Sequence, residues 1–413
     1  MGSYIYLGIE KLEIDWGKNY SFTDHSHLFQ VNDLRLIPYY YADDEVVMKE
    51  GYARSLSLVK HRLDLLGYTL ENLPTHFADF KNETLRFGCS DNEMMKYDVF
   101  YKAVYNIIIP CADSRYEQEG EEMYPSNYDF GEYVQKCIMK DLDIDIPKDL
   151  DLEERWALRS ICEFIENIDP YITLRIIAEN PKNSNCEVQW RFADVIDGGY
   201  VDKDCIIKPL EKHRRILIVT EGKTDSMILE RVINELYPNI SDFFYFIDMH
   251  DNYPFTGVGN LLNFYKGLAK IDIQNKVMFI FDNDTAGVEI YNETQKLDSP
   301  PNLGACCLPS HADFENFRTK GTEGESCSDI NGKAVTIECF LDLQNQKPYI
   351  RWRSYSEKMQ QYQGQICPKD DIINCFRKSN LTNGEYNVDK LKYLVDHIVA
   401  EISKQVIALN EVK

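Results

Sequence analysis

Two acidic motifs follow apolar runs in the second half of the chain. The run Ile216–Thr220 is followed directly by Glu221, and the run Val277–Phe281 is followed by Asp282 and, two residues later, Asp284. Short apolar runs of this kind predict buried strands. The carboxyl edge of a parallel sheet is where α/β proteins place their functional groups. Three carboxylates at such an edge predict a hard oxygen site suited to Mg²⁺ or Mn²⁺.

Two further carboxylates are candidates for the same site. Asp225 lies four residues after Glu221, so a helix starting here would place both on one face near an N-terminus that favours negative groups and phosphate. Gly222 would permit a close backbone approach. Glu338 lies inside the apolar run Ala334–Leu341. Each carboxylate alone has an ordinary explanation as a helix cap or a solvated side chain, and only the combination predicts a metal site.

The elements that would position these residues alternate in type from Lys212 onward. The pattern predicts strands over 215–220, 243–247, 276–281 and 303–308, and helices over 224–236, 258–269 and 285–297. Alternation of this kind predicts βαβ units that form a parallel sheet with right-handed crossovers. The tail from Asp370 to Val412 has a helical pattern that is interrupted near Asn383-Gly384.

The first half of the chain has a different pattern. Strands are predicted within 1–40, a helical region over 44–77 with a break at Gly67, an exposed loop over 113–129, an edge strand or linker over 141–147, a helix over 153–167 and a turn at Gly198-Gly199. We therefore expect a mixed α+β domain over 1–210, an α/β domain with a parallel sheet over 211–345, and a C-terminal helical segment over 346–413.

Charge and composition narrow the class of protein. The 413 residues are 44% hydrophobic, enough for large cores, and carry a net charge of −23. Residues 1–210 account for 22 − 39 = −17 of this charge and the remainder for 23 − 29 = −6. The acidic first half is a poor platform for nucleic acid and the second half a better one, where a bound divalent ion would also reverse the local potential.

Targeting and cysteine patterns point to a cytoplasmic protein. We find neither a signal peptide nor a run of 18 apolar residues, so no membrane association is expected. The 12 cysteines are scattered without a Cys-x-x-Cys pair, which favours reduced thiols over a zinc ribbon or thioredoxin-type site. The 8 histidines lack the spacing of a zinc hydrolase.

The two acidic motifs resemble the signature of the Toprim domain, in which a glutamate and glycine follow one strand and Asp-x-Asp follows a later one. Glu221-Gly222 and Asp282-Asn283-Asp284 carry this likeness. Toprim domains, with their Rossmann-like sheet, occur in topoisomerases, primases and OLD-type nucleases, which share metal-assisted making or breaking of phosphodiester bonds. Similarity to OLD-type nucleases implies roles for Asp225 and Glu338 at a second metal, and for Lys369 near the scissile phosphate.

The whole chain also resembles the bacterial HEPN/Toprim-associated proteins. Met1-Gly2-Ser3-Tyr4, the segment Arg62–Leu70 and the segment Asp329–Glu338 carry the likeness, which implies a role in phage defence. HEPN ribonucleases use an Arg and a His a few residues apart, and six residues separate Arg54 from His61 on the predicted helix. An ordinary alternative is that Arg54 snorkels and His61 faces solvent.

These observations lead to the expectation of a nuclease that hydrolyses DNA or RNA, as an endonuclease rather than an exonuclease. Mg²⁺ or Mn²⁺ would be the cofactor, with up to two ions. Asp282 and Asp284 would bind the first ion with help from Glu221, Asp225 and Glu338 would assist a second, and Lys369 or Lys223 would neutralise charge on the phosphate. A defence-system partner protein and a homo-oligomer are also expected. The alternatives are a non-catalytic sensor with a Toprim fold, and a primase-like or topoisomerase-like enzyme.

Overall fold

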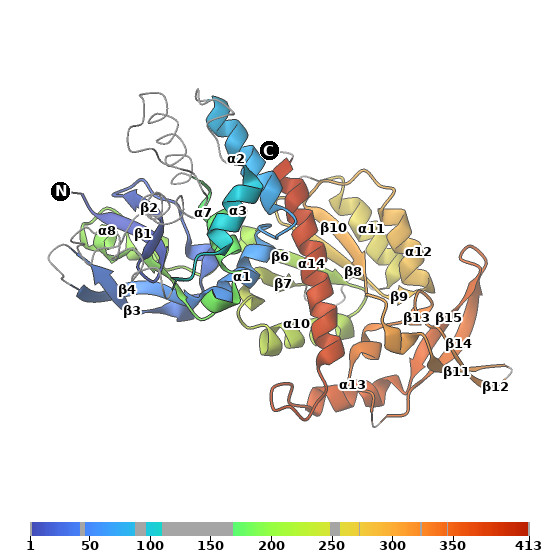
Figure 1. Cartoon of the computed structure of the whole chain (residues 1–413). Coiled ribbons are helices and arrows are strands. Elements are labelled where there is room, and N and C mark those ends of the chain that lie inside the picture. Colours follow the sequence, from blue (N-terminus) through green and yellow to red (C-terminus); the bar gives the residue numbers. More distant parts are fainter. Residues whose placement is uncertain are drawn as a thin grey trace. The chain divides into compact units, whose positions relative to one another are not determined.

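The chain divides into two compact units, Met1–Leu210 and Glu211–Lys413 (Figure 1). The computed structural model describes residues 2–41, 46–86, 96–109, 168–247, 257–271, 273–322, 324–344 and 346–411. The loop, edge strand and helix that the sequence predicts over 113–129, 141–147 and 153–167 lie outside the described residues. None of the described helices is long and apolar enough to cross a membrane.

A five-stranded antiparallel sheet forms the centre of the N-terminal unit. Its order is β2-β1-β5-β4-β3. The strands are β1 (Tyr4–Ile9), β2 (Leu12–Lys18), β3 (Leu34–Tyr40), β4 (Val46–Ser55) and β5 (Glu187–Arg191). Apolar and aromatic side chains bury one face, and among them Tyr52 lies stacked between Phe29 and Trp190. The strands predicted within residues 1–40 are confirmed.

Helices accompany this sheet, and the first of them starts later than predicted. They are α1 (Leu56–Leu65), α2 (Leu73–Arg86), α3 (Tyr97–Tyr105), α7 (Pro170–Ile177), α8 (Ala193–Asp197) and α9 (Lys203–Ile206). The prediction of a helical region from residue 44 is wrong over Val46–Ser55, because these residues form β4, which pairs with strands on both sides. Gly51 permits the close approach, since an added Cβ would lie 2.3 Å from the Ile37 side chain. The predicted breaks are confirmed, with Gly67 and Gly199 at positive φ.

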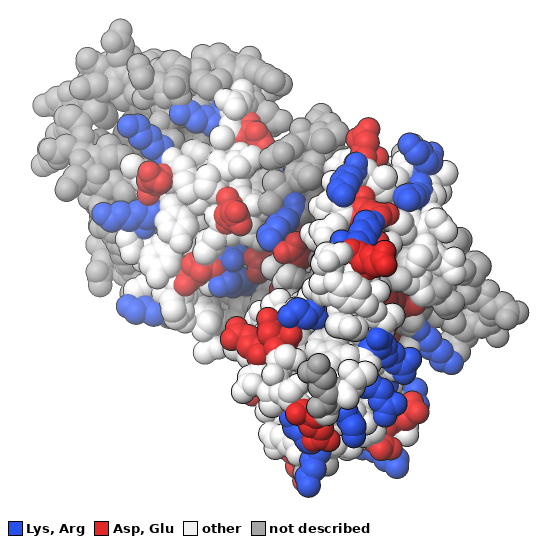
Figure 2. All heavy atoms as spheres, turned by 90° about the vertical axis from the view of Figure 1, so that its right-hand side faces the viewer, with Lys and Arg blue, Asp and Glu red and all other residues white. Residues whose placement is uncertain are grey.

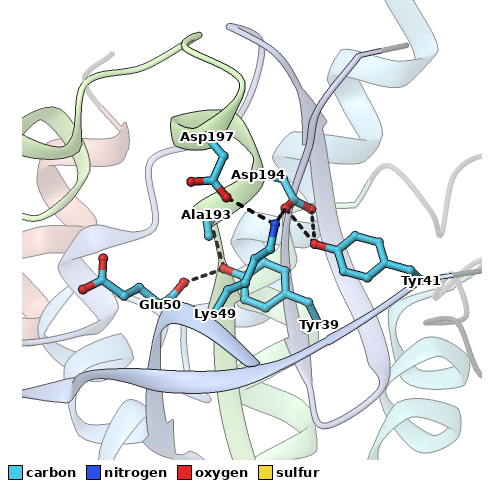
Figure 3. A network of polar contacts seen from close by, with 7 residues as sticks. All are labelled: Tyr39, Tyr41, Lys49, Glu50, Ala193, Asp194 and Asp197. Atoms are coloured by element: carbon cyan, nitrogen blue, oxygen red, sulfur yellow. Dashed lines mark hydrogen bonds and ion pairs between the residues drawn. The ribbon is translucent and has the colours of Figure 1, made fainter. Parts of the chain in front are cut away.

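A polar network fastens α8 to strands β3 and β4 (Figure 3). The Lys49 ammonium donates to Asp194 Oδ1 at 2.7 Å, and the Tyr41 hydroxyl donates to the same oxygen at 2.7 Å. Nearby, the Tyr39 hydroxyl accepts a hydrogen bond from the Ala193 backbone N–H at 2.9 Å. Because these groups come from β3, from Tyr41 just after it, from β4 and from the first turn of α8, they hold the start of α8 against the sheet.

The C-terminal unit contains a four-stranded parallel sheet in the order β10-β8-β6-β7. Its strands are β6 (Ile216–Thr220), β7 (Phe244–Phe246), β8 (Val277–Phe281) and β10 (Leu303–Cys307), joined through α10 (Lys223–Leu236), α11 (Val258–Leu268) and α12 (Thr285–Thr294). Each predicted strand and helix of this region is confirmed, and so is the parallel arrangement. One face of the sheet packs on α11 and α12 through Val219, Phe279 and Phe281.

A second sheet follows the parallel sheet in sequence, with the order β12-β11-β14-β15. Its strands are β11 (Phe317–Gly321), β12 (Gly324–Ser328), β14 (Tyr349–Ser356) and β15 (Gln361–Cys367). A short antiparallel pair, β9 (Asn283–Asp284) and β13 (Ala334–Val335), links the two regions.

The expectation of a C-terminal helical segment over 346–413 is therefore wrong for its first part, which contains β14 and β15. The segment between residues 349 and 367 is rich in aromatic residues and forms a hairpin, which suits residues of this type. The helices α13 (Lys369–Lys378) and α14 (Asp389–Glu411) follow it. The predicted interruption between them is confirmed, with Gly384 at positive φ.

Candidate metal centre

Parallel pairing of β6 with β8 brings the two acidic motifs together. Thr220 lies opposite Ile280, so Glu221 and Asp282 leave the sheet at the same edge. The Asp282 backbone N–H donates to Glu221 Oε1 at 3.0 Å. The first carboxylate is thus held by the backbone of the second motif, and both side chains are half-buried.

The backbone after β8 turns sharply to place Asp284. This residue is the N-cap of α12, and its Oδ1 accepts a hydrogen bond from the Gly287 N–H at 2.8 Å. A Cβ on Gly287 would lie only 2.2 Å from the Asp282 carbonyl oxygen, so this position requires glycine. Asp284 also pairs through its backbone with Ala334 of β13, which brings the segment containing Glu338 to the same region.

Gln363 is a positioning residue that the sequence did not indicate. Its Nε2 donates to Asp284 Oδ2, while its Oε1 accepts from the Ala286 backbone N–H at 3.0 Å. The amide therefore spans the start of α12 and holds the second oxygen of the capping carboxylate. Nothing in residue type or local spacing distinguishes Gln363 from its neighbours, because its role depends on the fold that brings β15 against α12.

Glu338 and Lys369 form an ion pair at the same site. Glu338 lies in the 3₁₀ helix η10 (Ile337–Phe340) and its side chain is completely buried. Lys369 Nζ lies 2.8 Å from Glu338 Oε1, and the Thr336 hydroxyl donates to the other oxygen at 2.6 Å. Asp225 lies in the first turn of α10 and is half-buried. The charge of Glu338 acts on Asp225, and the charge of Asp225 acts on Lys369.

Burial and mutual repulsion raise the pKa values of the acidic residues. Burial, followed by the charge of Asp284, raises the pKa of Glu221 to about 8. Burial, followed by the charge of Glu338, raises the pKa of Asp225 to about 7. Burial and the charge of Glu221 raise the pKa of Asp282 well above its usual range. Like charges crowded at a partly buried edge resist simultaneous ionisation.

Two further shifts show how the surroundings respond. Burial raises the pKa of Asp284, although hydrogen bonds from Gly287 and Gln363 oppose the shift. Burial would lower the pKa of Lys369, but the carboxylates of Glu338 and Asp225 outweigh burial and raise it. Lys369 is therefore a firmly protonated cation beside the acidic group. Lys223, the other candidate cation, begins α10 and is exposed.

The "acidic cluster" of Glu221, Asp225, Asp282, Asp284 and Glu338 is a donor set rather than a closed cage. In the part of the chain that the structure describes, no three His, Cys, Asp or Glu side chains are already arranged to enclose a metal ion. The donors are nevertheless of one kind, carboxylate oxygens, which suit Mg²⁺ or Mn²⁺. The raised pKa values of Glu221, Asp225, Asp282 and Asp284 are the expected result of burying carboxylates close together.

The Arg54 and His61 pair belongs to the N-terminal unit and does not share a helix. Arg54 lies in β4, is 6% exposed, and its Nε lies 3.0 Å from Asp33 Oδ2. His61 lies in α1 and is exposed. The prediction that one helix carries both residues is wrong, because β4 continues to Ser55. A ribonuclease role for the pair stays a prediction.

The family of the chain is established by its N-terminal part. The family described as HEPN/Toprim N-terminal domain 1 matches residues 1–214, more than half of the chain, and the chain belongs to this family. The chain matches no curated protein and no solved structure. Membership connects the protein with a nucleic-acid-related function and is compatible with a metal-dependent enzyme. The matched residues end before β6, so the acidic cluster is interpreted from its own geometry.

Proposed function

We propose that this protein is a divalent-metal-dependent nuclease whose active site is the acidic cluster. The observation that carries the proposal is geometric: the parallel pairing of β6 with β8 brings Glu221, Asp282 and Asp284 together at one sheet edge. Burial raises the pKa of each of these carboxyls. The carboxylates of such a site repel one another when they are ionised together. A divalent cation removes this repulsion by direct coordination. Metal-assisted phosphodiester hydrolysis is the reaction that this donor set supports best, given the nucleic-acid connection of the family.

Each residue of the cluster has a proposed role. Asp282 and Asp284 would hold the first ion together with Glu221, and Asp225 and Glu338 would assist a second. A bound divalent ion supplies an activated water and charge stabilisation for the leaving oxygen. The donor set fits either Mg²⁺ or Mn²⁺.

The chain's own groups prepare this site before any substrate binds. The Asp282 N–H orients Glu221, and Gln363 fixes the Asp284 carboxylate. The protonated Lys369, 39% exposed, provides positive charge that a phosphate oxygen could reach. Because these contacts exist within the folded chain, little reorganisation is needed to form the site, which is the condition for electrostatic catalysis.

The substrate would be DNA or RNA, cleaved internally. The resemblance to HEPN/Toprim-associated proteins implies a setting in phage defence, with a possible partner protein and self-association. Those parts of the proposal depend on the resemblance alone. The Arg54 and His61 pair is tested separately, since any RNA cleavage that survives EDTA should be lost in His61→Ala.

Cleavage assays test the proposal directly. Purified protein is incubated with plasmid, single-stranded DNA and total tRNA in Mn²⁺, Mg²⁺ or EDTA, alongside Asp284→Ala and Glu221→Ala. Glu230→Ala serves as the control, because Glu230 is an exposed carboxylate of α10. We expect metal-dependent cutting by the wild type and the control, and none by the two cluster variants.

Three other results would count against the proposal. Cutting that survives in both cluster variants would show that the active site lies elsewhere. Equal loss in Glu230→Ala would indicate a general effect of removing acidic charge. Metal binding without turnover on any substrate would favour a non-catalytic sensor.

A further inference from the structure

The second sheet of the C-terminal unit presents a row of basic side chains on its outward face. The "basic track" consists of Arg318 and Lys320 of β11 together with Arg351 and Arg353 of β14, all exposed. Figure 2 shows Lys and Arg gathered on the lower part of the face that looks out from the right-hand side of Figure 1, where β11, β12 and β14 lie. A basic surface of this kind is unexpected in a chain of net charge −23.

Strand register places Lys320 and Arg351 on one face of the sheet, and Arg318 shares that face two residues along β11, whereas Arg353 lies within the irregular part of β14 between Trp352 and Tyr355. Lys320 pairs with Arg351, and Arg351 pairs with Gln365 of β15, and residues directly opposite each other share a face. The other face is apolar and covered. Ile350 and Ile366 are buried there, and a Cβ on Gly364 would lie 2.6 Å from the Ala334 side chain. The basic face is therefore open to solvent at Arg318, Lys320 and Arg351, whereas along β15 it lies against the start of α12.

Most of the charge on the track has no acidic counterpart. Glu325 of β12 lies 3.2 Å from Arg318 and 3.8 Å from Lys320, and all three side chains are more than half exposed. Exposed pairs of this type contribute little. Arg351 and Arg353 form no ion pair with any residue that the structure describes. The track thus carries a surplus of positive charge that a polyanion could use.

The basic track lies close to the acidic cluster, and strand β15 connects the two. Gln363 lies two residues from Gln365 on β15 and therefore on the same face, and its amide donates to Asp284. Two residues along a strand span about 7 Å and neighbouring strands lie about 5 Å apart. The backbone of Arg351 is accordingly about 9 Å from that of Gln363, the residue that holds Asp284 in place.

We propose that the basic track binds the sugar–phosphate backbone of the nucleic acid and guides it to the acidic cluster. This inference rests on the proposed nuclease function and specifies where its substrate lies. A phosphate backbone fits the track better than an isolated anion would, because the charges form an extended row. The track also accounts for how a strongly acidic protein binds a polyanion: the attraction is local, and it acts next to the site of cleavage.

A binding assay with paired charge reversals tests the inference. Fluorescein-labelled single-stranded DNA and RNA oligonucleotides are titrated with the full chain in Ca²⁺ and in EDTA at several salt concentrations. The test variant is Lys320→Glu/Arg351→Glu. The matched control is Lys270→Glu/Lys296→Glu, which changes the net charge equally. Both control lysines are exposed and precede β8 and β10, toward the opposite edge of the parallel sheet.

We expect the test variant to bind at least about ten-fold more weakly. The slope of log K against log salt should become shallower by about 1.4, the value for the loss of two phosphate contacts on a single strand. The control should bind as the wild type does. Mn²⁺ affinity, measured by calorimetry, should be similar in all three proteins because the track holds no proposed metal ligand. This readout also reports whether the test variant is folded.

Two outcomes would overturn the inference, and they are distinguishable. If the wild type binds and cuts nucleic acid but the test variant binds as tightly as the control, the docking surface is wrong and the proposed function stands. If the wild type neither binds nor cuts any oligonucleotide, the proposed function fails and the docking surface fails with it.

Discussion

Replacing Glu221 by glutamine should stabilise the protein in the absence of metal while removing metal-dependent activity. Glutamine keeps the oxygen that accepts the Asp282 N–H but removes one negative charge from the cluster. Folding raises the pKa of Glu221 from 4.5 to about 8. Between these two values the folded chain binds more protons than the unfolded chain, so stability falls as pH rises through this window. The Glu221→Gln variant does not lose stability in this pH window, because the glutamine side chain does not ionise.

The size of the effect follows from the pKa shift. One pKa unit corresponds to about 1.4 kcal/mol, so a shift from 4.5 to about 8 sets an upper bound of about 5 kcal/mol for Glu221 above pH 8. Two effects reduce this gain in the free energy of unfolding: the neutral amide is itself costly to bury, and the site is partly exposed to solvent. We therefore expect a gain of about 1–3 kcal/mol. At about 2–4 °C per kcal/mol, the melting temperature should rise by about 2–12 °C.

Thermal unfolding in EDTA at pH 5 and pH 8.5 measures this difference. The Glu221→Gln variant should melt close to the wild type at pH 5, where the folded glutamate is already protonated, and clearly above it at pH 8.5. Added Mn²⁺ should raise the melting temperature of the wild type more than that of the variant. A variant that melts below the wild type at pH 8.5, or by a margin independent of pH, would refute the electrostatic reasoning.

Three further substitutions probe the contacts around the site and in the N-terminal unit. Lys369→Met should cost about 2–4 kcal/mol in a denaturant melt, since it leaves the buried Glu338 carboxylate unpaired, and adding Glu338→Gln should restore most of the loss. Gln363→Met should weaken Mn²⁺ binding about ten-fold in calorimetry with little change in melting temperature, because it frees one oxygen of Asp284; unchanged affinity would contradict its positioning role. Asp194→Ala should destabilise the chain by about 1–3 kcal/mol by removing the shared acceptor of a lysine and a tyrosine, whereas a neutral result in urea unfolding would show that solvent replaces it.

The parallel sheet and the meeting of the two motifs could be predicted because both follow from local patterns. Five-residue apolar runs separated by helical periodicity specify strands, helices and a parallel order. Once β6 and β8 are parallel neighbours, residues after their ends must share an edge, which brings Glu221 to Asp282. No knowledge of distant contacts is needed for this step.

The contacts that complete the site could not be predicted in the same way. Only the resemblance to OLD-type nucleases indicates Lys369. Its approach to Glu338 depends on the β14–β15 hairpin, which the sequence pattern does not predict. Gln363 is one amide in a strand whose partner across the site is the start of α12. Such contacts are set by tertiary packing, and no periodicity in the sequence encodes them.

The wrong prediction in the N-terminal half has a similar cause. The helical spacing of Leu56, Val59 and Leu63 is real and forms α1. The predicted helical region also includes Val46–Ser55, but these residues pair with β3 on one side and with β5 on the other. Pairing on both sides overrides local propensity, so Arg54 lies in a strand and His61 in the following helix.

Calorimetric titration of Mn²⁺ into metal-free protein at pH 7, in buffers of different ionisation enthalpy, is the most direct test of the acidic cluster as a metal centre. Binding with release of protons is predicted, because Glu221 and Asp225 have pKa values of about 8 and about 7 and must ionise to coordinate an ion. Both the binding and the proton release should be lost in Asp282→Asn/Asp284→Asn. Unchanged binding in that variant, or no binding by the wild type, would contradict the assignment of this cluster as the metal centre.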